Sequence, residues 1–325
     1  IYDDSDEGTQ FVNSGFMEPL DDLLPNDFWD DWPPEMMSMV KIWDQYKGET
    51  YRIHHNYEAQ YTFYRKDLFD EKGLNPARTW QEQAELGKEF TDEKKGFWAT
   101  SDGMLPGFFA VYLGYTTNQA GGNFFDVSDE YEEALQYIYD LMYKHKTLNP
   151  ASMQKDYDQQ NADYTSNRIA YMRQWPFFYD VSRGAKDWFS EEKVQIALPP
   201  VGPGGKSMST YAAGWGWSIP KTAPNKEAAK ILLQWLSNKE NAAKMVNYSV
   251  WYLSARKSVL KEANNKGLAK YLKMYADAGV ISPRPYHRKF NEVQQILQEE
   301  AGSYLTKQKS LKDTINDTKN RIEYM

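Results

Sequence analysis

Apolar and polar residues alternate in short runs along this chain, and longer amphipathic stretches separate those runs. Alternation is typical of a β-strand, because successive side chains of a strand point to opposite faces. Helices and short strands that follow one another in this way predict an α/β fold with partly parallel sheets. The strands are expected at 51–54, 61–65, 96–100, 168–174, 194–198 and 212–219.

Capping residues mark where several helices begin. Ser or Thr followed three residues later by Glu forms a capping box, and this pattern at Thr79 and Ser237 predicts helices that run towards Phe90 and Val246. Asn225 caps another helix. The apolar side of that helix is expected to carry Ala228, Ile231, Leu232 and Trp235, and further helices are expected over 128–142, 290–307 and, capped by Ser310, 311–322.

Length and charge limit the possible classes of protein. A chain of 325 residues exceeds the usual size of one domain, so two lobes are expected. The net charge of −8 and the lack of a basic run argue against nucleic-acid binding. With no cysteine, disulfides and thiolate metal sites are excluded. No apolar run is long enough to span a bilayer, and Ile1 and Tyr2 lack the basic and apolar regions of a signal peptide. Because Ile1 and Tyr2 run straight into the acidic loop at 3–8, as the end of a strand would, we expect the natural polypeptide to start earlier.

Two tryptophans on one predicted strand are the main candidates for ligand binding. Trp215 and Trp217 alternate with Gly214 and Gly216, so a strand would place both indoles on one face and bare backbone on the other. A face of this kind could stack against a flat ligand. Trp175, which follows another predicted strand and precedes a proline, is the second candidate platform.

An acidic loop close to the start of the chain has three possible roles. Asp3, Asp4, Asp6 and Glu7 could hold a hard cation, form a solvated turn, or accept hydrogen bonds from ligand hydroxyls. The later ligands of a calcium loop are not at their spacings, so a metal is not expected. We select Asp4 and Asp6 as candidate ligand contacts, because the carboxyl ends of strands in open α/β sheets face the binding crevice.

Other motifs do not predict catalysis or a cofactor. His54 and His55 would point to opposite faces of a strand and so do not form a zinc site. The segment 204–207 lacks a glycine of the phosphate-binding loop, since Pro200 stands in its place. No nucleophile elbow is present, although paired carboxylates stay possible among 46 acidic residues.

Four segments, in the right order, together resemble one family. They are NSGFMEPLDDLLP at 13–25, QYTFYRKDLFDEKGLNPARTWQE at 60–82, NRIAYMRQW at 167–175 and AGWGWSIPKTAPNKEAAKILLQWL at 213–236. These are similar to segments of the family 1 extracellular solute-binding proteins of ABC importers, the group that includes maltose-binding protein. The chain departs from the family pattern at Arg65 and Lys66, at Gln174 and at Ser254.

The resemblance implies a two-lobe fold of the periplasmic-binding-protein type (type II). Lobe 1 would comprise 1–64 and 211–280, lobe 2 would comprise 65–210, and 281–325 would form closing helices that belong mainly to lobe 2. The hinges would lie at 64–66, 209–214 and 280–285. The family normally begins with a strand–helix–strand unit that this sequence does not contain, so lobe 1 is expected to be incomplete at its N-terminus.

The resemblance also implies a function. The protein would capture a sugar or oligosaccharide between its lobes by hinge closure and deliver it to the transmembrane permease subunits of an ABC importer. It would act as a monomer outside the cytoplasm, in the periplasm or attached by a lipid to the outer face of the cell membrane. It would have no catalytic activity, no cofactor and no bound metal.

Candidate ligand contacts follow from the matched positions. Trp215 matches the tryptophan that stacks on sugar rings in the family, whereas Trp217 falls on a core position. Trp175 matches a second family tryptophan. Arg173 and Arg284 are cations that could bind one anionic group on the ligand. The remaining candidates lie where the family's chain approaches the ligand, and these are His55, Asn56, Tyr57, Trp251 and Tyr252.

Two alternatives stay open. A carbohydrate-active hydrolase would also use aromatic platforms and carboxylates. A binding protein of the same family could instead take a ligand that is not a plain sugar, such as a phosphorylated polyol or a peptide.

Overall fold

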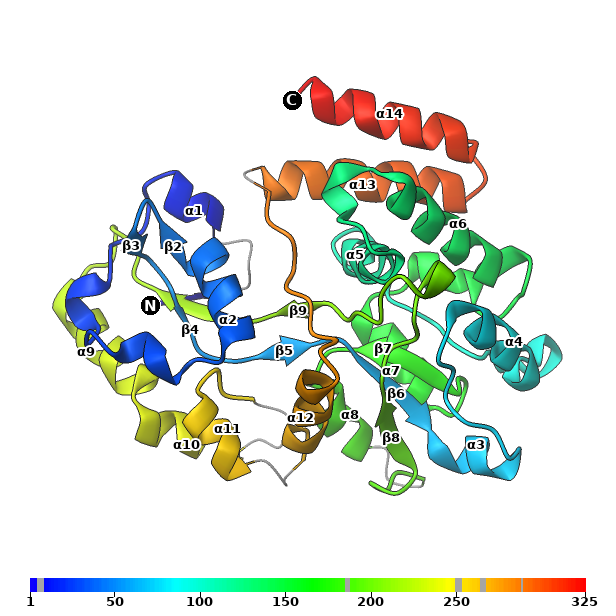
Figure 1. Cartoon of the computed structure of the whole chain (residues 1–325), viewed down its shortest axis with the longest axis horizontal. Coiled ribbons are helices and arrows are strands. Elements are labelled where there is room, and N and C mark those ends of the chain that lie inside the picture. The colour runs from blue at the N-terminus through cyan, green and yellow to red at the C-terminus, as the bar shows by residue number, and fades with distance from the viewer. Residues whose placement is uncertain (5–8, 185–187, 249–252, 264–266, 288) are drawn as a thin grey trace. The chain divides into compact units, whose positions relative to one another are not determined.

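A computed structural model covers residues 1–325 and describes all of them except 5–8, 185–187, 249–252, 264–266 and 288 (Figure 1). The chain divides into two compact units. Unit 1 comprises Ile1–Ala59 and Ala212–Phe290, and unit 2 comprises Gln60–Tyr211 and Asn291–Met325. The sequence placed the corresponding boundaries after residues 64, 210 and 280. The first observed boundary lies earlier because residues 61–65 pair within the sheet of unit 2.

The largest sheet of unit 1 brings together strands from three distant segments. β1 (Tyr2–Asp4) and β4 (Ile53–His54) flank β10 (Gly216–Ser218) in antiparallel pairs. β5 (Glu58–Ala59) pairs with β9 (Ala212–Ala213), and β2 (Gln45–Tyr46) pairs with β3 (Glu49–Thr50). The single strand expected over 212–219 is therefore two strands, and Trp215 lies between them. All these pairs are antiparallel, whereas the sequence predicted partly parallel sheets.

The helices of unit 1 surround these short strands. They are α1 (Thr9–Asn13), α2 (Pro34–Met39), α9 (Lys226–Ser237), α10 (Lys239–Tyr248), α11 (Lys257–Ala263) and α12 (Ala269–Asp277). The Asn225 side chain caps α9, as predicted, by accepting the N–H of Ala228. The cap of α10 is not Ser237, because Asn238 accepts the N–H of Asn241 instead.

The apolar side that the sequence predicted on helix α9 is exposed. Ile231, Leu232 and Trp235 are 67%, 47% and 57% exposed, and Ala228 is exposed as well. Leu233 is the buried apolar residue of this helix. Spacing along a helix shows which apolar residues share a face, but it does not supply the neighbour that would cover them.

Unit 2 is built on one antiparallel sheet. β6 (Tyr61–Arg65) is its central strand, between β7 (Tyr171–Gln174) and β8 (Val194–Ala197). The sequence predicted all three strands. The expected strand at 96–100 is absent from this sheet, and those residues make only isolated bridges to other segments.

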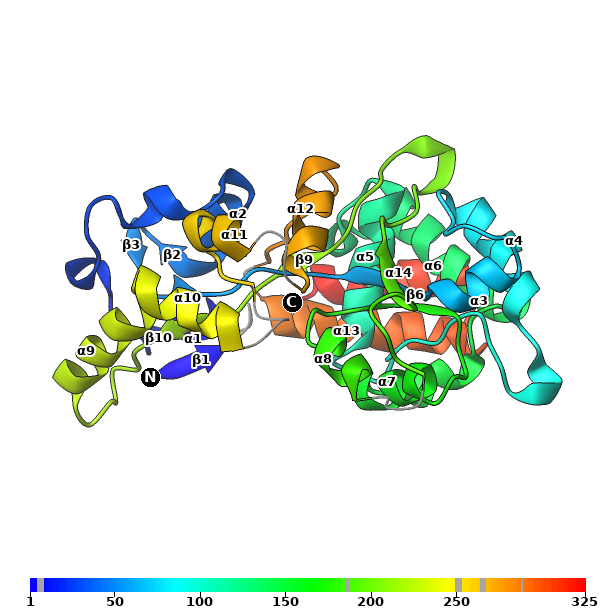
Figure 2. The ribbon, with the colours of Figure 1, turned by 90° about the horizontal axis from the view of Figure 1, so that it is seen from below.

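The helices of unit 2 pack around this sheet and on one another. They are α3 (Lys66–Glu71), α4 (Trp80–Phe90), α5 (Phe109–Ala120), α6 (Asp129–Tyr143), α7 (Tyr157–Thr165), α8 (Phe178–Arg183), α13 (Phe290–Leu305) and α14 (Leu311–Glu323). Figure 1 shows α13 beside α6 and α14, and a hydrogen bond of 2.9 Å joins Tyr304 of α13 to Gln136 of α6. Figure 2 shows α7 and α8 together. The predicted caps Thr79 and Ser310 accept the N–H groups of Glu82 and Asp313.

Aromatic residues dominate the core of unit 2. Phe69, Phe90 and Tyr171 pack with Ala99 and Ala170 in one buried cluster. Nearly every residue of α5 is buried, so this helix runs through the interior of the unit. No helix in the described parts of the chain combines the length and the apolar character needed to cross a membrane.

Candidate functional site

In unit 1, the backbone of Trp215 is held on both sides while its indole stays accessible. The N–H of Trp215 donates to Oδ1 of Asn56 at 2.6 Å, and its carbonyl accepts the N–H of His55 at 3.0 Å. The side chain is 42% exposed. This combination fixes the position of an aromatic face that solvent, and hence a ligand, can reach.

Trp217 has the opposite environment. It is only 6% exposed, and the imidazole of His55 stacks on its indole with ring centroids 4.0 Å apart and an interplanar angle of 15°. Nε2 of His55 bonds Oδ1 of Asp3 at 2.9 Å. Burial lowers the pKa of His55, and the hydrogen bond to Asp3 opposes that shift. The predicted core role of Trp217 is confirmed, but Trp215 does not share its strand.

Gly214 and Gly216 make room for a buried charged group. A Cβ on Gly214 would lie 2.2 Å from Nε2 of His54, and one on Gly216 would lie 2.4 Å from Nε of Arg52. Asp44 joins these two side chains, with its carboxylate 3.0 Å from Nδ1 of His54 and 3.4 Å from Nη1 of Arg52. The bare backbone expected at the glycines is thus covered by side chains of the same unit.

Other predicted contacts in unit 1 are buried. Asn56 is 3% exposed, and besides Trp215 it bonds Oε1 of Glu58 at 2.9 Å. Tyr57 is 1% exposed. Arg284 is 6% exposed, and its guanidinium carbon lies 4.4 Å from the ring centroid of Phe290.

The remaining predicted contacts lie in β1 or outside the described residues. Asp4 belongs to β1, where its backbone pairs with Gly216. Asp6, Trp251 and Tyr252 lie outside the described residues.

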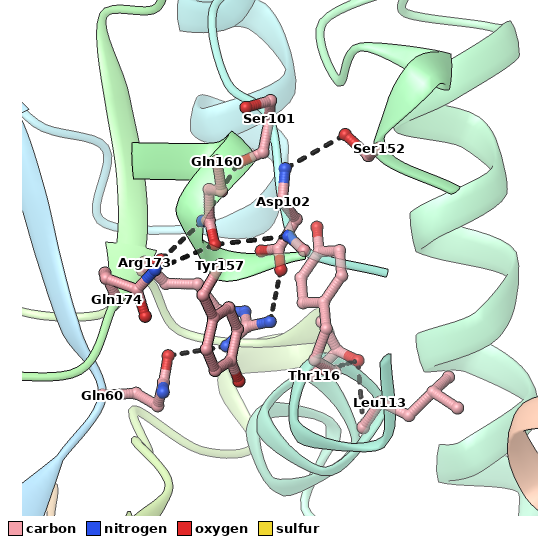
Figure 3. Close-up of polar contacts among 12 residues, drawn as sticks. Gln60, Ser101, Asp102, Leu113, Thr116, Ser152, Tyr157, Gln160, Arg173 and Gln174 are labelled. Atoms are coloured by element: carbon pink, nitrogen blue, oxygen red, sulfur yellow. Dashed lines mark hydrogen bonds and ion pairs between the residues drawn. The ribbon is translucent and has the colours of Figure 1, made fainter. Parts of the chain in front are cut away.

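In unit 2, a buried arginine is the centre of a polar group (Figure 3). Arg173, on β7, places Nη2 2.5 Å from Oδ1 of Asp102 and donates through Nη1 to Oε1 of Gln60 at 2.6 Å. Its guanidinium carbon lies 4.7 Å from the ring centroid of Tyr112 and 5.8 Å from that of Tyr115. We call Arg173, Asp102 and Gln60, with the Gln160 described next, the Arg173 cluster.

Gln160, on α7, ties the Arg173 cluster to the backbone around it. Its Nε2 donates to the carbonyls of Arg173 at 2.8 Å and Ser101 at 3.2 Å, and its Oε1 accepts the N–H of Gly103 at 3.2 Å. The N–H of Asp102 donates to the hydroxyl of Ser152 at 3.0 Å. Figure 3 shows Asp102 between Ser152, which accepts its backbone N–H, and Arg173, which contacts its carboxylate, so both the backbone and the side chain of Asp102 are held.

Trp175 lies next to the Arg173 cluster in sequence. It is half-buried, and its indole N–H donates to the hydroxyl of Tyr157 at 3.2 Å. The Tyr157 ring is also half-buried and packs edge-on against Phe108 at 4.7 Å. Unit 2 therefore combines partly accessible aromatic rings with buried polar side chains.

Charge in the Arg173 cluster is balanced internally. Burial raises the pKa of Asp102 to about 7, and the Arg173 guanidinium opposes that rise. Burial also disfavours the charge on Arg173, but the Asp102 carboxylate and nearby tyrosines outweigh it and raise the pKa of Arg173. Within the described parts of the chain, Nε2 of Gln60 and Nε of Arg173 are buried donors without a hydrogen-bond partner.

Sequence reasoning did not identify Gln60, Asp102 or Gln160. Gln60 directly precedes the predicted strand 61–65, and all four residues of β7 are buried. A strand buried on both faces is expected to be apolar throughout, so Arg173 and Gln174 within it were the available signal.

These groups are suited to binding a small polar molecule. Each unit separately offers an aromatic face and fixed hydrogen-bonding groups, which match a ligand with apolar C–H faces and a rim of hydroxyls. The class of protein that this chemistry fits is a receptor for a small polar molecule.

The family is shown by comparison with known proteins. The family model for bacterial extracellular solute-binding proteins matches residues 1–243, which is most of the chain. The protein belongs to the bacterial extracellular solute-binding protein family, as the sequence motifs predicted.

Two named relatives illustrate the similarity of the chain to known proteins. A probable ABC transporter-binding protein of Deinococcus radiodurans is 25% identical over 246 residues, which is 70% of this chain and 53% of that protein. The arabinooligosaccharide-binding protein of Halalkalibacterium halodurans is 24% identical over 216 residues, covering 63% and 46% of the two chains. The chain thus spans about half the length of these curated relatives.

Solved structures confirm the predicted fold class. Maltose-bound MalE3 of T. maritima superposes with a TM-score of 0.80 at 24% identity, covering 97% of this chain and 81% of that one. A tagatose-bound ABC transporter solute-binding protein of Thermotoga lettingae gives a TM-score of 0.85 at 22% identity, covering 98% and 83%. The fold is the two-lobe α/β fold of periplasmic binding proteins.

Proposed function

We propose that this protein is the substrate-binding component of an ABC importer and that it captures a sugar, an oligosaccharide or a related polyol. The observation that carries the proposal is the geometry of Trp215, whose indole is accessible while its backbone is held by Asn56 and His55. Family membership and relatives named for arabinooligosaccharide and mannitol binding support it.

The chemistry of the two units supports a carbohydrate ligand. A pyranose or an extended polyol presents C–H groups to an aromatic face, which Trp215 in unit 1 and Trp175 in unit 2 offer. Hydroxyl groups need donors and acceptors in fixed positions, and the Arg173 cluster holds such groups with bonds to the backbone. Selective binding of this kind requires no nucleophile.

The proposal includes closure of the two units on the ligand and delivery of the ligand to the transmembrane permease subunits. Family membership supports a location outside the cytoplasm, and attachment to the membrane by a lipid is one form that location would take. Small-angle scattering with and without a saturating ligand measures closure, because a closed form has a smaller radius of gyration.

A ligand screen tests the function. Thermal-shift and tryptophan-fluorescence measurements against maltose, arabino-oligosaccharides, D-mannitol and D-tagatose should reveal at least one ligand that stabilises the protein in proportion to its concentration. Reducing ends should not accumulate during incubation with oligosaccharides. Turnover would favour the hydrolase alternative, and a complete lack of binding across a broad carbohydrate panel would refute the proposal.

A further inference from the structure

We propose that Asp102 is a specificity-determining residue that makes unit 2 select uncharged polyhydroxylated ligands over their carboxylate or phosphate analogues. This inference rests on the proposed function, because it concerns which members of a carbohydrate panel bind. Asp102 acts by neutralisation, because its carboxylate is already paired with the positive charge of Arg173 before a ligand binds.

The geometry supports neutralisation within the cluster. A free arginine binds carboxylates and phosphates through two parallel N–H bonds, and this bidentate mode makes it a strong anion site. One N–H of each terminal nitrogen of Arg173 is already engaged, because Nη2 contacts Asp102 at 2.5 Å and Nη1 donates to Gln60 at 2.6 Å, so an anion would have to share the guanidinium with Asp102. The face of the guanidinium is covered in turn by the ring of Tyr112.

The charge pair is held in place by its neighbours. Asp102 and Arg173 have side chains only 4% and 5% exposed. Gln160 bonds the carbonyls of Arg173 and Ser101, and Ser152 accepts the N–H of Asp102. A ligand anion would therefore have to displace a buried carboxylate or lie close to one, and both are unfavourable in an environment of low dielectric constant.

The donors that the pair leaves unused suit a neutral oxygen. Nε2 of Gln60 and Nε of Arg173 are buried and have no hydrogen-bond partner among the described residues. A hydroxyl or ring oxygen can accept from such donors without bringing charge. The cluster can thus contribute directional hydrogen bonds while its net charge stays near zero.

Matched ligand pairs test this inference in the full chain. Isothermal titration at pH 8 compares each neutral ligand found in the screen with its carboxylate or phosphate analogue, for example D-mannitol with mannitol 1-phosphate. Wild-type protein should bind the neutral member at least about tenfold more tightly, a difference of about 1.4 kcal/mol. Asp102→Asn should weaken neutral binding and shift the preference towards the anion by at least about tenfold, with anion binding that weakens as salt rises.

A matched control separates neutralisation from general damage. Asp163→Asn removes another buried carboxylate of unit 2, one that accepts the Ser101 hydroxyl at 2.7 Å and pairs with Lys155 rather than Arg173. It should leave the ratio of neutral to anionic affinity unchanged. If Asp102→Asn does not fold, as judged by circular dichroism, the double variant Asp102→Asn with Arg173→Gln should fold and keep the neutral preference.

The outcomes are distinguishable. Wild-type protein that binds the anionic analogue as tightly as the neutral ligand overturns the inference and leaves the proposed function intact. A folded Asp102→Asn variant that keeps the wild-type ratio, or a double variant that prefers the anion, also overturns the inference alone. Protein that binds neither member of any pair refutes the proposed function, and the inference with it.

Discussion

The side-chain oxygen of Asn56 accepts the backbone N–H of Trp215 at 2.6 Å, across 159 positions of sequence. The same amide donates to Glu58 at 2.9 Å. A single buried side chain therefore links the accessible indole to the segment that runs from β4 to β5.

Replacing Asn56 by Ala should weaken sugar binding and destabilise the protein. The substitution leaves the N–H of Trp215 without its acceptor, and an unsatisfied group of this kind costs about 1–3 kcal/mol. Urea unfolding measures the stability and titration measures the affinity. The control is Asn26→Ala, an exposed asparagine of the same unit, which should change neither quantity. Equal behaviour of the two variants would show that Asn56 does not position Trp215.

Trp215→Ala and Trp217→Ala should separate binding from folding. Trp215 is accessible, so its loss should reduce the affinity for a sugar by about 1–3 kcal/mol with little effect on stability. Trp217 is buried, so its truncation should cost about 3–5 kcal/mol of unfolding free energy. Thermal denaturation and titration of both variants provide the comparison. An unchanged affinity in Trp215→Ala would remove that residue from the site.

Gly216→Ala should destabilise unit 1 because the new methyl group overlaps a buried side chain. Its Cβ would lie 2.4, 2.5 and 2.9 Å from atoms of Arg52, which is 1% exposed. Overpacking of this kind typically costs about 1–3 kcal/mol. The matched control is Gly302→Ala in α13, where the nearest atom is 3.9 Å away and alanine should stabilise the helix by up to about 1 kcal/mol. Chemical denaturation of the two variants should give shifts of opposite sign.

The stability of the protein should fall as the pH is lowered through the titration range of His55. Burial lowers the pKa of this side chain below its ordinary value of 6.5. Between the pKa of His55 in the folded protein and 6.5, the unfolded state binds more protons than the folded state. The contribution of His55 to the free energy of unfolding is therefore complete above pH 6.5 and is lost as the pH falls through the folded pKa. Subtracting the pH profile of His55→Gln from that of wild type isolates this contribution from other groups. A difference that shrinks as the pH rises would contradict the assignment.

The sequence correctly predicted those elements that depend on residues close to one another in the chain. The strand 61–65 and the caps at Thr79, Asn225 and Ser310 depend on alternation and on side chains within three positions, and the structure contains all of them. The expected strand 96–100 makes single bridges to Ile169 and Leu148 instead of a continuous ladder, and the extent of pairing depends on distant segments that local alternation does not specify.

The same distinction between local and long-range contacts explains which residues of the candidate site were predicted. Trp215 and Trp217 stood out because of their spacing between glycines, but that spacing placed both indoles on one face. The buried environment of Trp217 was predicted by the resemblance to the family. The Arg173 cluster was not predicted, because Arg173 meets Asp102 across 71 positions and Gln60 across 113. One sequence alone does not show which residues so far apart in the chain are in contact. The only indication of the Arg173 cluster was the position of an arginine in a buried strand.

The uncovered side of α9 determines how this protein should be handled in solution. A net charge of −8 keeps molecules apart at low ionic strength, but salt screens that repulsion beyond about 10 Å at 0.1 M. Four apolar side chains, Ala228, Ile231, Leu232 and Trp235, then become a point of contact between molecules. Raising the salt concentration to test for ionic ligand binding should therefore also promote self-association of the protein. Repeating each measurement at a lower protein concentration separates the two effects, because self-association depends on protein concentration.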